Sequence, residues 1–187
     1  LQVYAILQDV TGGLFIGTGA GVFGSHDGGV TWNPSGLGSS TIRGLAAAND
    51  GVLYAATGTE GIFSSGDGGT SWISRGLVRS DIQTVGVSGA GHVFVGVASG
   101  LYFSTDMGAT WTRKIFTNGH VHSILFNGNF NVFAGSSYGL FSSLDGGRSW
   151  SAAGLDRQFV ISLSYDQDHT ITAAIYKGGV ARTSEII

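Results

Sequence analysis

One eight-residue segment occurs four times in this chain. The copies read SHDGGVTW at 25–32, SGDGGTSW at 65–72, STDMGATW at 104–111 and SLDGGRSW at 143–150. Their last residues, Trp32, Trp72, Trp111 and Trp150, lie 40, 39 and 39 residues apart. A fifth copy begins at Gly179 and matches only part of the pattern. This regular spacing indicates a repeat architecture with one structural unit per period.

Each period carries short runs of alternating residues interrupted by glycine, a pattern typical of β-strands. In the second period the predicted strands cover residues 41–48, 52–57, 61–65 and 70–74. The segment Asn49-Asp50-Gly51 predicts a hairpin turn between the first two, because Asp-Gly readily adopts positive φ. Four antiparallel strands repeated at this spacing are typical of a propeller blade.

We therefore predict an all-β fold: a five-bladed β-propeller of four-stranded antiparallel blades, formed by a single domain over residues 1–187. The repeats divide at about 1–38, 39–78, 79–117, 118–156 and 157–187. The last blade is predicted to be incomplete, with strands at 160–166, 171–175 and 179–184 and no fourth. Its open edge either stays short, is covered by residues 185–187, serves self-association, or marks part of a longer propeller.

Composition narrows the classes of function. Only 11% of the 187 residues are charged and 33 are glycine, which does not suit long helices. A net charge of −3 gives no basic surface for nucleic acid, and no apolar run reaches the ~18 residues of a membrane span. The absence of cysteine excludes disulfides, thiolate metal sites and thiol catalysis. Because the chain begins at Leu1 without a Met, we expect a processed or trimmed product.

The repeated segments resemble the Asp-box, or BNR repeat, with the pattern Ser-x-Asp-x-Gly-x-Thr/Ser-Trp. Similar repeats occur in sialidases, xyloglucanases, sortilin-type receptors, photosystem II assembly factors and secreted bacterial propellers. The resemblance implies a β-propeller and a secreted or periplasmic, bacterial-like protein. It also implies that the boxes lie at the periphery, opposite the usual ligand site.

We expect the boxes to be structural. Their carboxylates, Asp27, Asp67, Asp106 and Asp145, can accept hydrogen bonds from backbone N–H groups of their own turns. Their tryptophans, Trp32, Trp72, Trp111 and Trp150, supply large apolar rings to bury. Four metal sites or an aromatic sugar platform remain as the less favoured interpretation.

Equivalent positions that vary among the repeats are better candidates for binding. On the predicted inner strands one such set is Tyr4, Arg43, Gln83, His122 and Ile161. Loops at the same mouth contribute Glu60, Tyr138, Tyr176 and Lys177, and Arg79, Asp81, Phe116, Asn118, His120, Arg157 and Phe159. We predict a ligand site for a glycan, peptide or protein surface formed by Tyr4, Arg43, Gln83, His122, Tyr138 and Tyr176. The alternative is that these are ordinary residues lining a wet channel.

Catalysis has weaker support. A glycosidase needs two carboxylates ~5–10 Å apart across one cleft, for which Glu60 and Asp81 are the candidates. A sialidase-like site needs an arginine cluster, but Arg43 alone lies on a predicted inner strand. His120 and His122 share one face of a strand without a third metal ligand. We expect no metal, no cofactor and no enzyme, with a glycoside hydrolase-related propeller and a purely structural repeat protein as alternatives.

Overall fold

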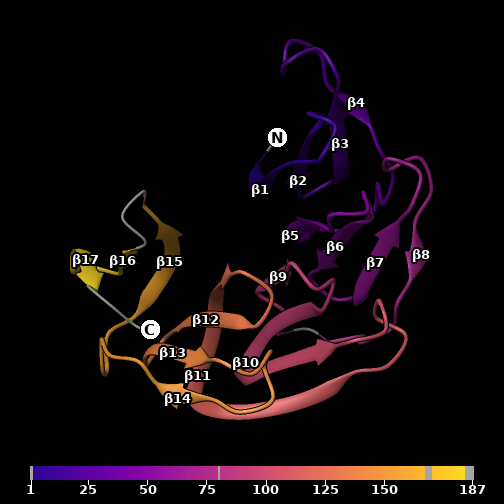
Figure 1. Cartoon of the computed structure of the whole chain (residues 1–187). Helices are drawn as coiled ribbons and strands as arrows, with labels where there is room; N and C mark the ends of the chain where they lie inside the picture. Colours follow the sequence, from indigo (N-terminus) through magenta and orange to yellow (C-terminus); the bar gives the residue numbers. More distant parts are fainter. Residues whose placement is uncertain (1, 80, 167–169, 184–187) are drawn as a thin grey trace.

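The computed structural model describes residues 2–79, 81–166 and 170–183. Within these ranges the chain forms seventeen β-strands and no helix (Figure 1). Every pair of hydrogen-bonded strands is antiparallel. The all-β, antiparallel prediction is confirmed. No helix long and apolar enough to cross a membrane occurs in the described part of the chain.

The strands follow the predicted period. The first repeats contain β1 (Val3–Gln8), β2 (Leu14–Thr18), β3 (Gly21–Ser25), β4 (Asn33–Pro34), β5 (Ile42–Ala47), β6 (Leu53–Thr57), β7 (Ile62–Ser65) and β8 (Ile73–Ser74). The later ones contain β9 (Thr84–Val87), β10 (Val93–Ser104), β11 (Thr112–Asn127), β12 (Asn131–Ser136), β13 (Gly139–Ser143), β14 (Ser151–Ala152), β15 (Val160–Tyr165), β16 (Ile171–Ile175) and β17 (Gly179–Thr183).

Three sheets follow the chain in simple order, β1-β2-β3-β4, β5-β6-β7-β8 and β15-β16-β17. The remaining sheet has six strands in the order β14-β13-β12-β11-β10-β9. It joins two repeats because β11 is continuous: residues 112–120 pair with β10, and residues 121–127 pair with β12. β11 therefore supplies the outer strand of one repeat and the inner strand of the next.

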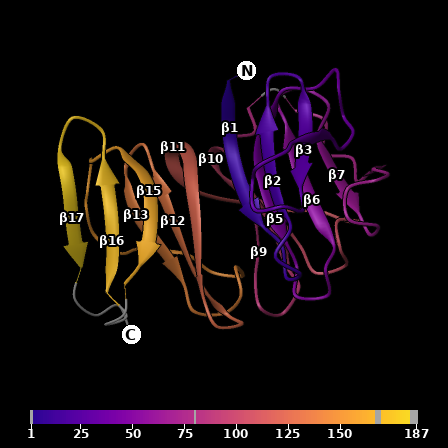
Figure 2. The same cartoon turned by 90° about the horizontal axis from the view of Figure 1, so that it is seen from above.

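The sheets stand face to face around an arc, with β1–β4 at one end and β15–β17 at the other (Figures 1 and 2). Successive inner strands are in contact, β1 with β5, β5 with β9, β9 with β11 and β11 with β15. Apolar clusters fill the spaces between neighbouring sheets. Every residue of β6 is buried, because a sheet inside the arc is covered on both faces. This packing explains why so few residues are charged.

In the second repeat the predicted strand boundaries hold to within one residue except at the outer strand. Residue 184, the predicted end of the last strand, lies outside the described residues. The hairpin at Gly51 is confirmed: its φ is 88° and its N–H donates to Ala48 O at 3.0 Å. The strand predicted at 70–74 is wrong in length, since β8 contains only Ile73–Ser74. Its first residues belong to the preceding turn, where the Ser71 hydroxyl donates to Asp67 at 2.6 Å.

The repeated aspartates organise these turns. Ser104 Oγ donates to Asp106 Oδ1 at 2.7 Å, Thr110 N donates to the same oxygen at 2.8 Å, and Thr110 Oγ1 donates to Oδ2 at 2.6 Å. Equivalent bonds surround Asp27, Asp67 and Asp145. Each carboxylate thus serves its own turn, as the sequence predicts.

Three of the repeated tryptophans contact the preceding repeat, whereas Trp32 Nε1 donates to Gly29 O of its own turn at 3.0 Å. All four rings are half-buried. Trp72 Nε1 donates to Ser35 O in the preceding repeat at 2.6 Å, and Trp111 Nε1 donates to Arg75 O at 2.9 Å. Trp150 stacks on Phe116, with ring centroids 4.4 Å apart. Phe116 therefore packs under this tryptophan, and its predicted place at the channel mouth is wrong.

Because these carboxylates accept hydrogen bonds in the folded protein, we expect the protein to lose stability in acid. Hydrogen bonds from Ser71 to Asp67 and from Ser104 to Asp106 hold the pKa of each carboxyl at about 2, below the ordinary 3.8. A folded-state pKa below the unfolded one stabilises the fold above the unfolded value, and this contribution is lost as pH falls. We expect the melting temperature, followed by tryptophan fluorescence, to drop between pH 4 and pH 2, because the carboxyls titrate between the unfolded pKa of 3.8 and the folded pKa of about 2.

The Asp106→Asn variant provides the control for this pH dependence. Its amide cannot titrate, so its melting temperature should change less over the same pH range than that of the unmodified protein. An equally steep curve for both proteins would contradict the assignment of the effect to these turns.

Candidate functional site

A cavity of about 420 Å³ lies where the inner strands converge. Its lining includes all five predicted inner-strand residues, Tyr4, Arg43, Gln83, His122 and Ile161. They come from β1, β5, the residue before β9, β11 and β15. The structure therefore brings together side chains that are spread over more than 150 residues of sequence, as ~40-residue spacing around an arc requires.

A recurring β-bulge places four of these side chains. The pairing register shifts between Val3 and Ala5 in β1, and at the equivalent place in β5, β11 and β15. The residues left out of the ladder are Tyr4, Arg43, His122 and Ile161. A bulged residue leaves the regular alternation and its side chain is re-aimed. The sequence predicts the positions of these residues but not the bulge, since no glycine or proline recurs at this place in the four strands.

The cavity is polar, with one permanently charged side chain. The Arg43 guanidinium lies 5.4 Å from the centroid of the Tyr4 ring, within cation–π range. His122 Nε2 lies 2.9 Å from Ser137 Oγ. Burial, and to a lesser degree the neighbouring His120, lower the pKa of His122. His122 is therefore a neutral hydrogen-bonding group at neutral pH.

Aromatic rings extend from the cavity toward the last sheet. The His122 and Phe159 ring centroids are 4.6 Å apart, and those of Phe159 and Tyr176 are 5.4 Å apart. The Lys177 ammonium lies 5.3 Å from the Tyr176 centroid. Tyr176 thus reaches the site through Phe159, which the predicted set of ligand-binding residues omits. The signal for Phe159 was its place in an inter-repeat loop beside the variable histidine.

Tyr138 is the predicted site residue with the least connection to the cavity. It is 52% exposed on the turn between β12 and β13 and is not among the lining residues. Its backbone is fixed, since Tyr138 N donates to Ser136 Oγ at 3.0 Å and Arg157 N donates to Tyr138 O at 3.2 Å. Its role in binding stays a prediction.

The two candidate catalytic carboxylates have other partners. Arg79 Nε and Nη2 donate to Asp81 Oδ1 and Oδ2 at 2.7 and 2.8 Å, and these hydrogen bonds lower the pKa of Asp81. Glu60 accepts a hydrogen bond from Ser40 Oγ. Neither carboxylate lines the cavity. Both carboxylates thus take part in contacts within the protein.

The histidine pair has no third metal ligand beside it in the part of the chain that the structure describes. The rings of His120 and His122 have centroids 6.0 Å apart. Among the residues that the structure describes, no three His, Cys, Asp or Glu side chains group around a common point. His169, a third histidine of the chain, lies outside the described residues.

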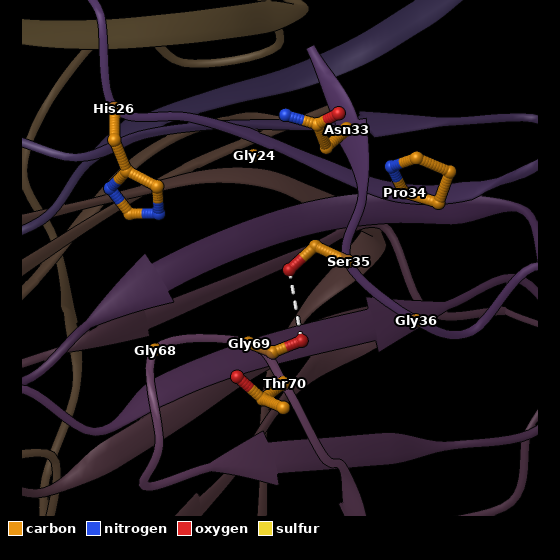
Figure 3. A pocket seen from close by; sticks show the side chains of 9 residues that line it. All are labelled: Gly24, His26, Asn33, Pro34, Ser35, Gly36, Gly68, Gly69 and Thr70. Carbon is orange, nitrogen blue, oxygen red and sulfur yellow. Dashed lines mark hydrogen bonds between the residues drawn. The ribbon is translucent and has the colours of Figure 1, made fainter.

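A second pocket, of about 260 Å³, lies at the outer edge between the first two repeats (Figure 3). Glycines 24, 36, 68 and 69 and the segment 33–35 form most of its wall. Ser35 Oγ donates to Gly69 O at 2.9 Å across it. Because its groups serve the junction between repeats, we regard it as structural.

Comparison with known proteins identifies the fold and no family. No family model and no curated protein matches the chain. Many solved structures are similar to the chain, and three of them are described. The extracellular domain of BT4673 from B. thetaiotaomicron matches with a TM-score of 0.77 at 16% identity, over 98% of this chain and 27% of that one. A GH74 enzyme of Niastella koreensis matches with a TM-score of 0.72 at 20% identity, over 94% and 33%.

Another similar structure is YCF48 bound to D1 peptide, with a TM-score of 0.72 at 16% identity, over 92% of this chain and 61% of that one. The chain spans less than two thirds of the length of each of these proteins. Identities this low show the fold alone. The chain is an all-β repeat protein with a β-propeller-like architecture.

Proposed function

We propose that the protein is a non-catalytic binding module that takes a carboxylate-bearing peptide segment in the cavity at the centre of the arc. In this proposal the five repeats are five blades of one domain, and the repeated turns are Asp-box (BNR) motifs. The protein acts outside the cytoplasm, secreted or periplasmic. The proposal draws support from the extracellular domain among the similar structures.

One observation carries the proposal: the residues that vary most in chemistry among equivalent inner-strand positions all line one cavity. Packing dictates the equivalent buried positions, which are aliphatic throughout, as in Ile42, Ile82, Val121 and Val160. It does not dictate the chemistry of Tyr4, Arg43, Gln83 and His122. A set of different polar groups converging on one space is what a specific ligand site requires.

The charge of the cavity favours an acidic group in the ligand. Among the described residues that line it, Arg43 carries the one permanent charge and none is Asp or Glu. A guanidinium binds a carboxylate with two parallel hydrogen bonds. Gln83 and His122 add neutral hydrogen-bonding groups suited to peptide amides. The adjoining Phe159 and Tyr176 rings offer an apolar surface for a ligand side chain.

The test measures binding of the purified protein to a synthetic peptide library in which each peptide has either a free or an amidated carboxyl terminus. We expect peptides with a carboxylate to bind, and Arg43→Ala to weaken binding by roughly tenfold or more through loss of a charge-assisted pair. His122→Ala should weaken the same peptides. The melting temperature should not change for Arg43→Ala, because this side chain is exposed.

Arg113→Ala is the matched control. Arg113 is also exposed and also lies over a tyrosine, 5.9 Å from the Tyr102 centroid, but outside the cavity. Its removal should leave binding unchanged. Binding that survives Arg43→Ala and His122→Ala would overturn the proposed site, and binding to a glycan array instead of peptides would overturn the ligand class.

A glycoside hydrolase-related function is the second candidate, because a GH74 enzyme is among the similar structures. It requires Glu60 and Asp81 to act on a sugar although both have protein partners. Glu60→Gln and Asp81→Asn must each abolish turnover of a polysaccharide. An absence of turnover on a panel of polysaccharides would end this candidate.

A further inference from the structure

A separate pocket of about 270 Å³ lies between the second and third sheets. We call it the Tyr54 pocket; it is formed by residues 48–50, Tyr54, residues 89–91, Thr105 and Met107. Two hairpin turns and one of the repeated turns thus meet there, and Asn49 Nδ2 donates to Gly89 O at 3.5 Å between the hairpins. Among the described residues, none lines both this pocket and the central cavity.

Tyr54 brings a buried hydroxyl to this pocket. Its ring belongs to the apolar cluster between the second and third sheets, and the equivalent rings at the other junctions are Phe15, Phe94 and Phe133. Tyr54 is 1% exposed, and in the described part of the chain its hydroxyl has no hydrogen-bond partner. The hydroxyl oxygen is nevertheless accessible, since it is not one of the fully buried polar atoms without a partner. A buried hydroxyl needs a partner, and here the partner can enter through the pocket.

Met107 is the second residue of the pocket that differs from the other repeats. Gly28, Gly68 and Gly146 occupy the same place in the other repeated turns, and all four residues have positive φ, 58° at Met107. A side chain at positive φ is strained, and the three glycines avoid this strain. The Met107 side chain lines the pocket and is 55% exposed. Strain that three repeats avoid and one retains indicates a function for the methionine side chain.

Asp50 sets the charge of the pocket. It is the one charged residue among the described residues that line it. Asp50 Oδ1 accepts a hydrogen bond from Val52 N at 3.1 Å, which leaves Oδ2 for a ligand. Burial raises the pKa of Tyr54, and the charges of Arg75 and Asp50 also act on it, so both lie near its hydroxyl. Arg75 donates through Nε to Ser64 Oγ at 2.7 Å and does not line the pocket.

We propose that the Tyr54 pocket is a second binding site, for a small organic cation with a primary ammonium group and a short alkyl chain. The ammonium group donates to Asp50 Oδ2 and to the Tyr54 hydroxyl, and the alkyl chain packs on the Met107 thioether. The volume of about 270 Å³ lies below the ~300–1,000 Å³ of sites for drug-sized ligands, and therefore suits a small molecule. The inference does not depend on the ligand proposed for the central cavity.

Met107 is the only methionine of the chain and therefore gives a direct probe of this pocket. Protein labelled with carbon-13 at the methionine methyl group has one such signal in its NMR spectrum. We expect n-butylammonium chloride to shift this signal until the site is saturated. Sodium butyrate and sodium chloride at the same ionic strength should leave it in place, because Asp50 attracts a cation and repels a carboxylate. A signal that butylammonium does not shift, or that butyrate shifts equally, would overturn the proposal.

Tyr54→Phe should raise the dissociation constant of butylammonium about tenfold, through loss of a hydrogen bond to a charged group. This variant should fold, because phenylalanine is the residue at the equivalent place in other repeats. Tyr102→Phe is the matched control: the Tyr102 hydroxyl accepts from Arg79 Nη1 at 3.2 Å and Tyr102 lies outside the pocket lining. Its affinity should equal that of the unmodified protein. Equal dissociation constants for Tyr54→Phe and the unmodified protein would contradict the proposed site.

Met107→Gly distinguishes a role in binding from a role in the turn. Removal of the strained side chain should raise the urea concentration at which the protein unfolds. The same change should weaken butylammonium binding, followed in this variant by the backbone amide signals of residues 89–91, because the alkyl chain loses its contact. A variant that loses stability and keeps its affinity would show that the methionine serves the turn, and would overturn its role in the site.

Discussion

Replacing Phe94 by alanine should lower the free energy of unfolding by about 3–5 kcal/mol. Phe94 is fully buried in β10, and its ring packs on Phe103 and Phe126 with centroids 5.9 and 5.4 Å apart. Phe126 belongs to the next repeat, so the lost ring leaves a cavity between two repeats and not merely within one. Urea denaturation followed by tryptophan fluorescence should show a lower midpoint with an unchanged slope.

Phe130→Ala is the matched control for this prediction. Phe130 is 51% exposed, so its removal should change the free energy of unfolding by no more than about 0.5 kcal/mol. Similar destabilisation by both variants would mean that the packing between repeats does not hold the arc together. A change of slope for Phe94→Ala alone would instead indicate that repeats unfold separately.

The sequence predicts the fold well because the same pattern of strands and turns occurs in each repeat. Each turn carries its own aspartate, and Asp106 makes all its described hydrogen bonds within residues 104–110. Hydrogen bonds between residues so close in sequence can be predicted from the sequence of one chain. The period then fixes the order of the strands. The inner-strand residues of the cavity follow from the same alignment of repeats.

What the sequence does not predict depends on contacts between repeats. The sequence predicts that the Trp72 ring is buried but not that its Nε1 donates to Ser35 O in the preceding repeat. The sequence predicts Phe116 at the mouth, but in the structure it lies within β11 and stacks on Trp150. The count of five blades and the roles of Tyr138 and Tyr176 stay predictions. The direction of a side chain at a β-bulge, and its contacts with the neighbouring repeat, depend on how the sheets pack together. A pattern within one repeat therefore does not predict them.

Gly61→Ala should be far more destabilising than Gly179→Ala, although both glycines have positive φ, +96° and +81°. Their places are equivalent, since Gly61 directly precedes β7 and Gly179 is the first residue of β17. A Cβ atom at Gly61 would overlap the carbonyl oxygen of Gly76, which accepts the hydrogen bond of Ile62 N at 2.9 Å. The outer segment would have to move away, and that hydrogen bond would be lost. At Gly179 a Cβ atom meets nothing within 4 Å.

The comparison separates two effects that act together at Gly61. Gly179→Ala measures the conformational strain of positive φ alone, about 1–2 kcal/mol. Gly61→Ala adds the steric overlap, about a further 1–3 kcal/mol in overpacked sites. Equal losses, measured by urea denaturation, would contradict the close contact between the third strand and the outer segment. A larger loss for Gly61→Ala would show that the contact with the outer segment is the main reason for a glycine at this position. Gly179 lacks this contact, because no outer strand covers it in the part of the chain that the structure describes.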